Sequence, residues 1–119
     1  MGNLQVIGAR GEAAACRALL ARGYRIVARN VRSRAGELDL VCRDGEAYVF
    51  CEVKARRPSA FGAPQEALTA AKRARLARLA SGYLARVGRP SVLWRVELVA
   101  VDLDGRGEPR GVDVVPVWY

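Results

Sequence analysis

Two apolar runs on either side of Asp44-Gly45 dominate the hydrophobic pattern of the chain. Residues 36–56 read GELDLVCRDGEAYVFCEVKAR, and Asp-Gly between alternating apolar residues favours a tight β-hairpin. If Asp44 and Gly45 are the two loop residues, Glu37 lies opposite Glu52. Because side chains alternate between the faces of a strand, this register predicts one apolar face and one face that carries charge.

The charged face of the predicted hairpin gathers its acids at the end away from the turn. It contains Glu37, Asp39, Glu52 and Lys54, and the apolar face contains Leu38, Leu40, Cys42, Ala47, Val49, Cys51 and Val53. Acids at cross-strand spacing repel one another unless a cation neutralises them. Carboxylates suit Mg²⁺ or Mn²⁺, and a lysine beside them stabilises charge on a reacting phosphate or positions a water. The pattern predicts a metal site for phosphodiester hydrolysis; the alternative is a solvated strand face.

The flanking segments predict two helices and three further strands. A helix is expected over residues 8–22, where Gly23 ends it. Strands are expected over residues 24–31 and 92–103, and a long helix over residues 65–87. After a turn-rich connection, residues 112–118 form a last strand, which Pro116 assigns to an edge of the sheet.

Glu12 falls on the stripe of the first helix that should face the sheet. That stripe also carries Gly8, Ala15, Cys16 and Leu19. A carboxylate among such residues is costly unless it is paired or bound to metal. Glu12 is therefore either part of the metal site or a partly exposed residue that the helix dipole stabilises.

The long helix is predicted to be apolar in one half of its buried stripe and polar in the other. Gln65 and Lys72 share a stripe with Leu76 and Leu79, at the end nearest Lys54. Both polar side chains are expected to reach towards a bound phosphate. Four arginines are expected on the remaining surface, as a solvated face or as phosphate contacts: Arg73, Arg75, Arg78 and Arg86. The loop over residues 56–64 begins with Arg56 and either contacts a substrate backbone or serves only as a linker.

Composition favours a polyanionic partner and excludes several chemistries. The 119 residues carry a net charge of +8, from twenty basic and twelve acidic residues, which favours nucleic acid as a partner. The alternative is that a GC-rich genome has enriched the chain in arginine without any role in binding.

The residue types also exclude several chemistries. No histidine is present, so histidine-dependent hydrolysis is excluded. Three cysteines in apolar contexts predict reduced core thiols rather than a zinc site. No run is long enough for a membrane span and no signal peptide is evident, so we expect a cytoplasmic protein.

The combined motifs resemble the PD-(D/E)xK nuclease core, and more closely the YraN-like family of small bacterial proteins. The resemblance rests on G-x-x-G-E-x-x-A from residue 8, G-Y-x-I-V-x-R-N from residue 23, G-E-L-D-L, F-C-E-V-K-A-R, and F-G-x-P-Q-E-A-L followed by Lys72. Two departures are Leu38, where the nuclease motif has proline, and Val96-Glu97, where the family tends to have Phe-Asp. The resemblance implies a restriction-endonuclease-like α/β fold in one domain over residues 1–119, with a mixed sheet of about five strands and two main helices.

The resemblance and the residues together favour a Mg²⁺- or Mn²⁺-dependent endonuclease acting on DNA, including branched or repair intermediates. Asp39 and Glu52 would hold the metal, with Glu12 and Glu37 as supporting carboxylates and Lys54 as the stabilising cation. The expected substrate-binding residues are Gln65, Lys72 and Arg56. One alternative is a nucleic-acid-binding or partner-binding protein that keeps the fold without turnover. Another is a structural module that forms a homodimer through its C-terminal edge strand.

Overall fold

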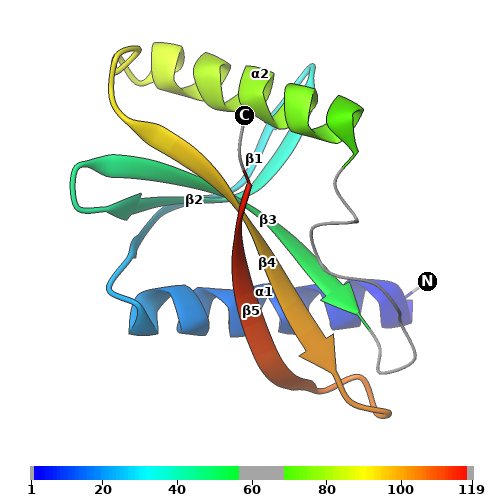
Figure 1. The fold of residues 1–119 in the computed structure, drawn as a ribbon. Coiled ribbons are helices and arrows are strands. Elements are labelled where there is room, and N and C mark those ends of the chain that lie inside the picture. The colour runs from blue at the N-terminus through cyan, green and yellow to red at the C-terminus, as the bar shows by residue number, and fades with distance from the viewer. Residues whose placement is uncertain (1, 57–68, 118–119) are drawn as a thin grey trace.

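Five strands and two helices make up the computed structural model (Figure 1), which describes residues 2–56 and 69–117, with side chains from residue 8 onward. In chain order the elements are α1 (Gly2–Ala21), β1 (Arg25–Ser33), β2 (Gly36–Asp44), β3 (Ala47–Arg56), α2 (Ala70–Arg86), β4 (Trp94–Leu103) and β5 (Pro109–Val117). The strands form one sheet in the order β1-β2-β3-β4-β5. Strands β3 and β4 are parallel, and the other neighbours are antiparallel. The predicted α/β fold with a five-stranded mixed sheet is confirmed, and it is consistent with a restriction-endonuclease-like fold.

The two helices cover opposite faces of the sheet and divide the core into two clusters (Figure 1). On the α2 side, Phe50, Leu76 and Leu98 belong to a cluster of fully buried side chains. On the α1 side, Leu19 and Val99 belong to the second cluster. Because a sheet with a helix on each face is buried on both sides, its central strands are apolar at consecutive positions, as in Val96–Val101 apart from Glu97.

The β2–β3 hairpin forms, but its predicted register is wrong. Val41 pairs with Phe50, and the last pair before the turn is Asp44 with Ala47. The loop residues are therefore Gly45 and Glu46. Gly45 has φ 61°, and a left-handed first loop residue is a conformation that glycine adopts without steric cost. The predicted pairs of Glu37 with Glu52 and of Asp39 with Phe50 therefore do not form, since the β2–β3 ladder ends at Leu40 and Cys51.

The helix boundaries also differ from the prediction. Helix α1 begins at Gly2, well before residue 8. Helix α2 begins at Ala70, because Thr69 has an extended backbone and its side-chain oxygen accepts a hydrogen bond from the backbone N–H of Lys72. This N-cap contradicts a continuous helix over residues 65–87. Gln65 and the loop residues 57–64 lie outside the described residues. Strand β5 is at an edge of the sheet, as Pro116 predicted.

Candidate active site at the fork between β2 and β3

Strands β2 and β3 separate after the pair Leu40–Cys51, and this separation creates the candidate site. Beyond it, β3 stays paired with β4 as far as Arg56, while β2 stays paired with β1 back to Gly36. The first residues past the last pair are Asp39 and Glu52. We call this place the β2–β3 fork, bounded by residues 37–39 and 52–54.

Asp39 occupies the fork itself. Its Oδ2 accepts a hydrogen bond of 2.7 Å from the backbone N–H of Val53. The carboxylate thus takes the place of a backbone carbonyl of β2, which no longer pairs with β3 at this point. Burial raises the pKa of Asp39 to about 6; the Val53 N–H opposes the rise, and the charges of Glu52, Glu37 and Glu12 add to it. Glu52, Glu37 and Glu12 are therefore each close enough to act on the charge of Asp39.

The predicted common face of the acids is wrong in one respect. A cavity of about 230 Å³ is lined by Gly8, Glu12, Asn30, Glu37, Asp39, Val53 and Ala55. Val53 and Ala55 pack with the α1-side core, so the alternating positions Glu52 and Lys54 belong to the other face of β3. The acids thus approach the fork from two sides. Leu38 and Leu40 were also predicted to share one face, but Leu38 packs with the α2-side core and Leu40 with the α1-side core.

Glu52 carries an unsatisfied buried atom. Its Oε2 is buried and has no hydrogen-bond partner among the described residues. A buried carboxylate oxygen without a donor is costly and calls for an explanation such as a bound cation or water. Lys54, two residues further along β3, is exposed. An ammonium group at that position is accessible to an anion that approaches the fork.

Glu12 reaches the cavity because α1 lies close to β3. Gly11 is buried, and a Cβ atom built on it would lie 3.4 Å from the Cβ of Ala55. A side chain larger than that of alanine at this position would meet the strand. The adjacent Glu12 is half-buried, and its Oε1 accepts a hydrogen bond of 3.4 Å from Asn30. Glu12 therefore lines the same cavity as Glu37 and Asp39 and keeps part of its surface exposed.

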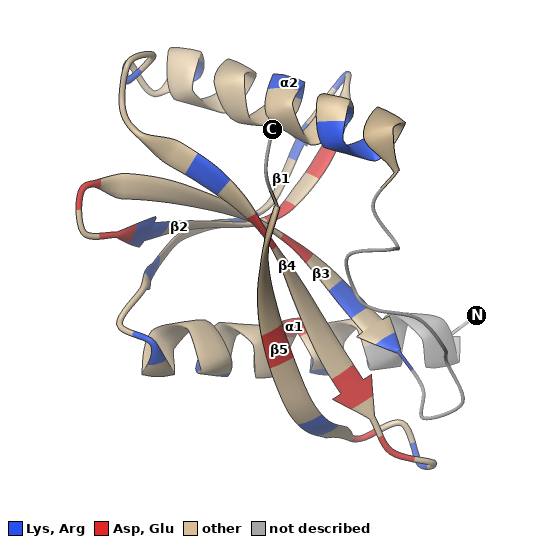
Figure 2. Cartoon of the chain, in the orientation of Figure 1, with Lys and Arg blue, Asp and Glu red and all other residues tan. Residues whose placement is uncertain are grey.

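The N-terminal half of α2 brings basic side chains to the start of β2. A Cβ atom built on Gly36 would lie 3.6 Å from Cδ of Arg75. Lys72, Arg73 and Arg75 are all half-buried, so two of the arginines expected on the outer surface instead face the protein. The Nε atoms of Arg73 and Arg75 are buried and have no hydrogen-bond partner in the described part of the chain. Figure 2 shows basic segments both there and at the end of β3.

Arg56, a predicted substrate-binding residue, is engaged by acids of neighbouring strands. Its Nε donates to Asp102 of β4, and its terminal nitrogen lies 3.6 Å from Asp113 of β5. The two acids raise the pKa of the guanidinium, with the Asp102 hydrogen bond as the largest cause. To contact a phosphate, Arg56 would have to share or leave these partners.

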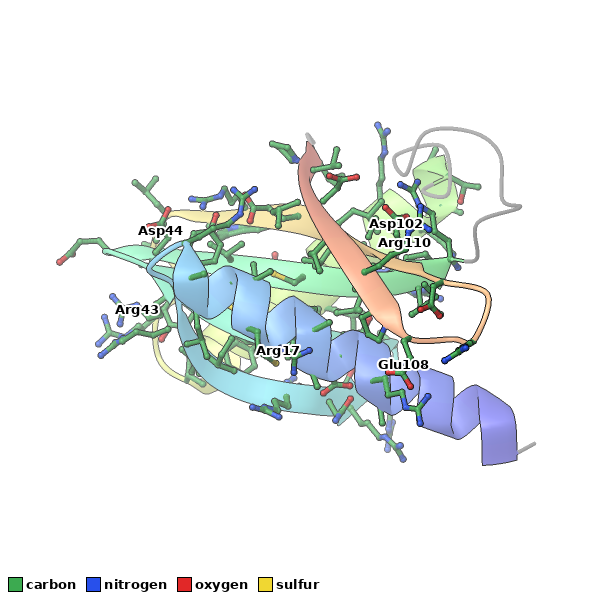
Figure 3. All side chains as sticks on the ribbon, turned by 90° about the horizontal axis from the view of Figure 1, so that it is seen from below. Arg17, Arg43, Asp44, Asp102, Glu108 and Arg110 are labelled. Carbon is green, nitrogen blue, oxygen red and sulfur yellow. The ribbon has the colours of Figure 1, made fainter. Side chains whose placement is uncertain are left out.

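A second polar network lies at the opposite end of the sheet. Glu97 is 5% exposed, and its carboxylate accepts hydrogen bonds from the Tyr24 hydroxyl (3.0 Å) and from Nε of Arg95 (3.1 Å). Arg95 also donates to Asp44 at 2.9 Å. Figure 3 shows Asp44 and Asp102 near opposite ends of the sheet, with α1 running across one face of the sheet. Every member of this network has a partner, which indicates a structural role.

Three further features of the described residues bear on function. Within residues 2–56 and 69–117, no three cysteine or acidic side chains are grouped closely enough to hold a metal ion by themselves. All three cysteines are free and buried, as predicted. None of the described helices combines the length and apolar character needed to cross a membrane.

Sequence comparison places the chain among bacterial proteins of one family. A UPF0102 protein of Symbiobacterium thermophilum is 55% identical over 102 residues, which cover 84% of this chain and 86% of the relative. A UPF0102 protein of Chlorobaculum tepidum is 46% identical over 101 residues, covering 85% of this chain and 78% of the relative. Residues 11–101, which span α1 to β4 and contain the whole fork, match the uncharacterised protein family UPF0102. This family is the YraN-like family that the motifs indicated, and the chain belongs to it.

Proposed function

We propose that the chain is a metal-dependent endonuclease that hydrolyses phosphodiester bonds in DNA, with the β2–β3 fork as its active site. The observation that carries the proposal is the pair of acids at the fork. Asp39 lies there with a raised pKa, and Glu52 has a buried oxygen without a donor. Both features describe carboxylates that lack a neutralising partner.

The acids of the fork fit Mg²⁺ or Mn²⁺. Hard cations take oxygen ligands, and Mg²⁺ is usually bound through one or two carboxylates together with waters and substrate phosphates. Asp39 and Glu52 would supply those carboxylates, with Glu12 and Glu37 adding negative charge around them. This arrangement needs no group of three protein ligands. When bound, the ion would stabilise negative charge on the phosphate and lower the pKa of a bound water.

The basic residues around the fork have separate roles in this proposal. Lys54 is the exposed cation nearest Glu52 along β3, and its compact ammonium would stabilise charge developing at the phosphate or orient the attacking water. Lys72, at the start of α2, would contact the substrate backbone together with Gln65. Arg56 would contribute a further phosphate contact by sharing or leaving Asp102 and Asp113.

Cleavage of a panel of labelled DNAs tests the proposal. Duplex, flap and four-way junction substrates are incubated with Mg²⁺ or Mn²⁺ and the wild type, Glu52→Gln, Lys54→Arg or Arg78→Lys. We expect Glu52→Gln to be inactive and Lys54→Arg to lose about 10²–10³ in rate, because arginine is larger and planar. Arg78 is exposed on α2, so Arg78→Lys is the matched control and should keep its activity. Full activity in Glu52→Gln would exclude the fork as the active site.

A nucleic-acid-binding protein without turnover is the second candidate. The acids approach the fork from two sides, with Glu12, Glu37 and Asp39 but not Glu52 lining the cavity, and the described residues contain no group of three acids that could hold a metal; both observations favour this candidate. Metal-dependent stabilisation separates the two candidates. Mg²⁺ or Mn²⁺ at millimolar concentration should raise the melting temperature of the nuclease and leave Asp39→Asn unchanged. DNA binding by the wild type without cleavage or metal stabilisation would favour the second candidate.

A further inference from the structure

Asn30 has an unusual backbone for a residue inside a strand. It is the one non-glycine residue with positive φ in the described part of the chain, at 51°. A left-handed conformation is unfavourable for a residue that bears a side chain, although asparagine tolerates it better than most. Such a residue persists where the surrounding structure requires it, and it often marks a functional site.

The register places Asn30 directly opposite Asp39. Arg29 pairs with Leu40, and Val31 pairs with Leu38, so Asn30 and Asp39 are the residues between two regular pairs. They do not themselves pair in the ladder. Between the Ala28–Val41 pair and the Ser33–Gly36 pair, the only unpaired position of the β1–β2 ladder therefore coincides with the acid of the fork.

Both strands change face at this point. Leu38 and Val41 of β2 pack with the same α2-side core although they are three residues apart, and so do Ala28 and Val31 of β1. Residues three apart in a regular strand face opposite sides of the sheet. The alternation of faces is therefore interrupted by one extra residue in each strand, Asn30 in β1 and Asp39 in β2. The two interruptions lie opposite each other, so the register of the pairs on either side is unchanged.

The matched irregularity turns Asp39 out of both faces of the sheet. Leu38 packs on the α2 side and Leu40 on the α1 side, so Asp39 between them points sideways, where it accepts the Val53 N–H at 2.7 Å. The Asn30 amide meanwhile donates to Glu12 at 3.4 Å. Asn30 thus contacts Glu12 and lies opposite Asp39, two of the acids around the cavity.

We propose that Asn30 is a positioning residue whose left-handed backbone turns Asp39 into the β2–β3 fork while its amide holds Glu12 beside it. This inference deepens the proposed function and takes its chemical meaning from it. Asn30 itself would touch neither the reacting phosphate nor the metal. The conformation of its backbone is the main contribution, because it changes the direction of the opposite residue.

Hydrogen exchange of the metal-free protein tests the backbone contribution without any assay of activity. The reporter is the Val53 amide, which donates to Asp39, and the internal reference is the Cys51 amide in the regular part of the hairpin. Asn30→Gly retains access to positive φ, whereas Asn30→Ala disfavours it. We expect Asn30→Ala to reduce the protection of Val53 relative to Cys51 at least tenfold, and Asn30→Gly to preserve it. Arg29→Ala is the control, at the neighbouring exposed position. An unchanged Val53-to-Cys51 ratio in Asn30→Ala would overturn the proposal.

Calorimetric titration with Mn²⁺ extends the test to the site. Loss of a residue that orients metal ligands typically weakens affinity 10–100-fold. We expect Asn30→Ala to weaken Mn²⁺ binding by about tenfold, and Asn30→Gly to weaken it less, since only the contact with Glu12 is lost. Equal affinity in all three proteins would also overturn the proposal. If the wild type binds no Mn²⁺, the proposed metal-dependent function fails, and the exchange experiment still decides the role of Asn30.

Discussion

At the scale of single residues, the main property of the site is the unfavourable charge of Asp39. Its carboxylate is partly removed from water, faces three other acids, and receives one backbone donor, that of Val53. The folded-state pKa of about 6 exceeds the ordinary value of 3.8. The folded protein therefore holds a proton on Asp39 more readily than the unfolded chain, and ionising this group destabilises the fold.

Replacing Asp39 by asparagine should stabilise the metal-free protein in a pH-dependent way. Above pH 6, where wild-type Asp39 is ionised in both states, Asp39→Asn should raise the free energy of unfolding by about 1–2 kcal/mol, after discounting for solvent screening. The advantage should shrink as the pH falls from 6 towards 3.8, because the wild-type residue then becomes neutral as well. Urea unfolding at pH 7.5 and pH 4.5 measures both effects.

Glu46→Gln is the control for that comparison, because Glu46 is an exposed acid in the hairpin turn. It should change stability by less than about 0.5 kcal/mol at either pH. An Asp39→Asn protein that is less stable than the wild type at pH 7.5 would show that the carboxylate is favourably placed without metal.

At the scale of elements, the buried network of Tyr24, Arg95 and Glu97 joins the start of β1 to β4. Glu97→Ala leaves the Arg95 guanidinium and the Tyr24 hydroxyl without their shared acceptor, so we expect a loss of about 3 kcal/mol. Tyr24→Phe removes a neutral hydroxyl that donates to Glu97 and accepts from Arg95, and it should cost about 1 kcal/mol. Asp44→Ala removes only an exposed partner of Arg95 and should cost less than about 1 kcal/mol. Urea unfolding of the three variants gives the order, and equal losses in all of them would contradict the buried role of Glu97.

The start of α2 depends on a single capping residue. The Thr69 hydroxyl oxygen accepts the backbone N–H of Lys72 at 3.2 Å, so Thr69→Ala should destabilise the protein by about 1 kcal/mol. Thr69→Ser keeps the oxygen and should remain within a few tenths of a kcal/mol of the wild type. Thermal unfolding of both variants measures the difference. Equal loss in the two would show that the methyl group of Thr69, rather than its cap, is responsible.

At the scale of the whole molecule, the charge of +8 should govern binding to nucleic acid. Basic residues lie at the end of β3 and on the N-terminal half of α2 (Figure 2), while the acids occupy the fork between β2 and β3. A polyanion would meet a basic periphery before it reaches the acidic centre. This separation permits attraction to phosphate while leaving the carboxylates available for a cation.

DNA affinity should fall steeply with salt and show little dependence on sequence. If about four phosphates are contacted, affinity should drop roughly 100-fold between 50 and 200 mM salt. Fluorescence anisotropy with two duplexes of equal length and unrelated sequence measures both properties. Affinity that is independent of salt, or a strong preference for one sequence, would exclude backbone phosphates as the main contact.

The sequence by itself determined the local chemistry of the chain. The hairpin and the edge position of β5 followed from side-chain alternation, turn residues and Pro116, which act over a few residues. Helical spacing put Glu12 on the stripe of its helix that faces the sheet but left two interpretations of it open. The family followed from the same motifs. The prediction placed the helix start at Gln65 because the capping role of Thr69 went unrecognised.

Only the tertiary structure decided how the acids are arranged. The hairpin slipped by one residue on each strand because Gly45, rather than Asp44, takes the first loop position. Arg75 turned inward because α2 packs against the start of β2, which no periodicity reveals. Asp39 left the regular alternation because Asn30, on a different strand, adopts a left-handed backbone opposite it. Strand alternation is a local rule, whereas the direction of a side chain at an irregular pair depends on its neighbour across the sheet, and that neighbour is fixed only when the strands pair.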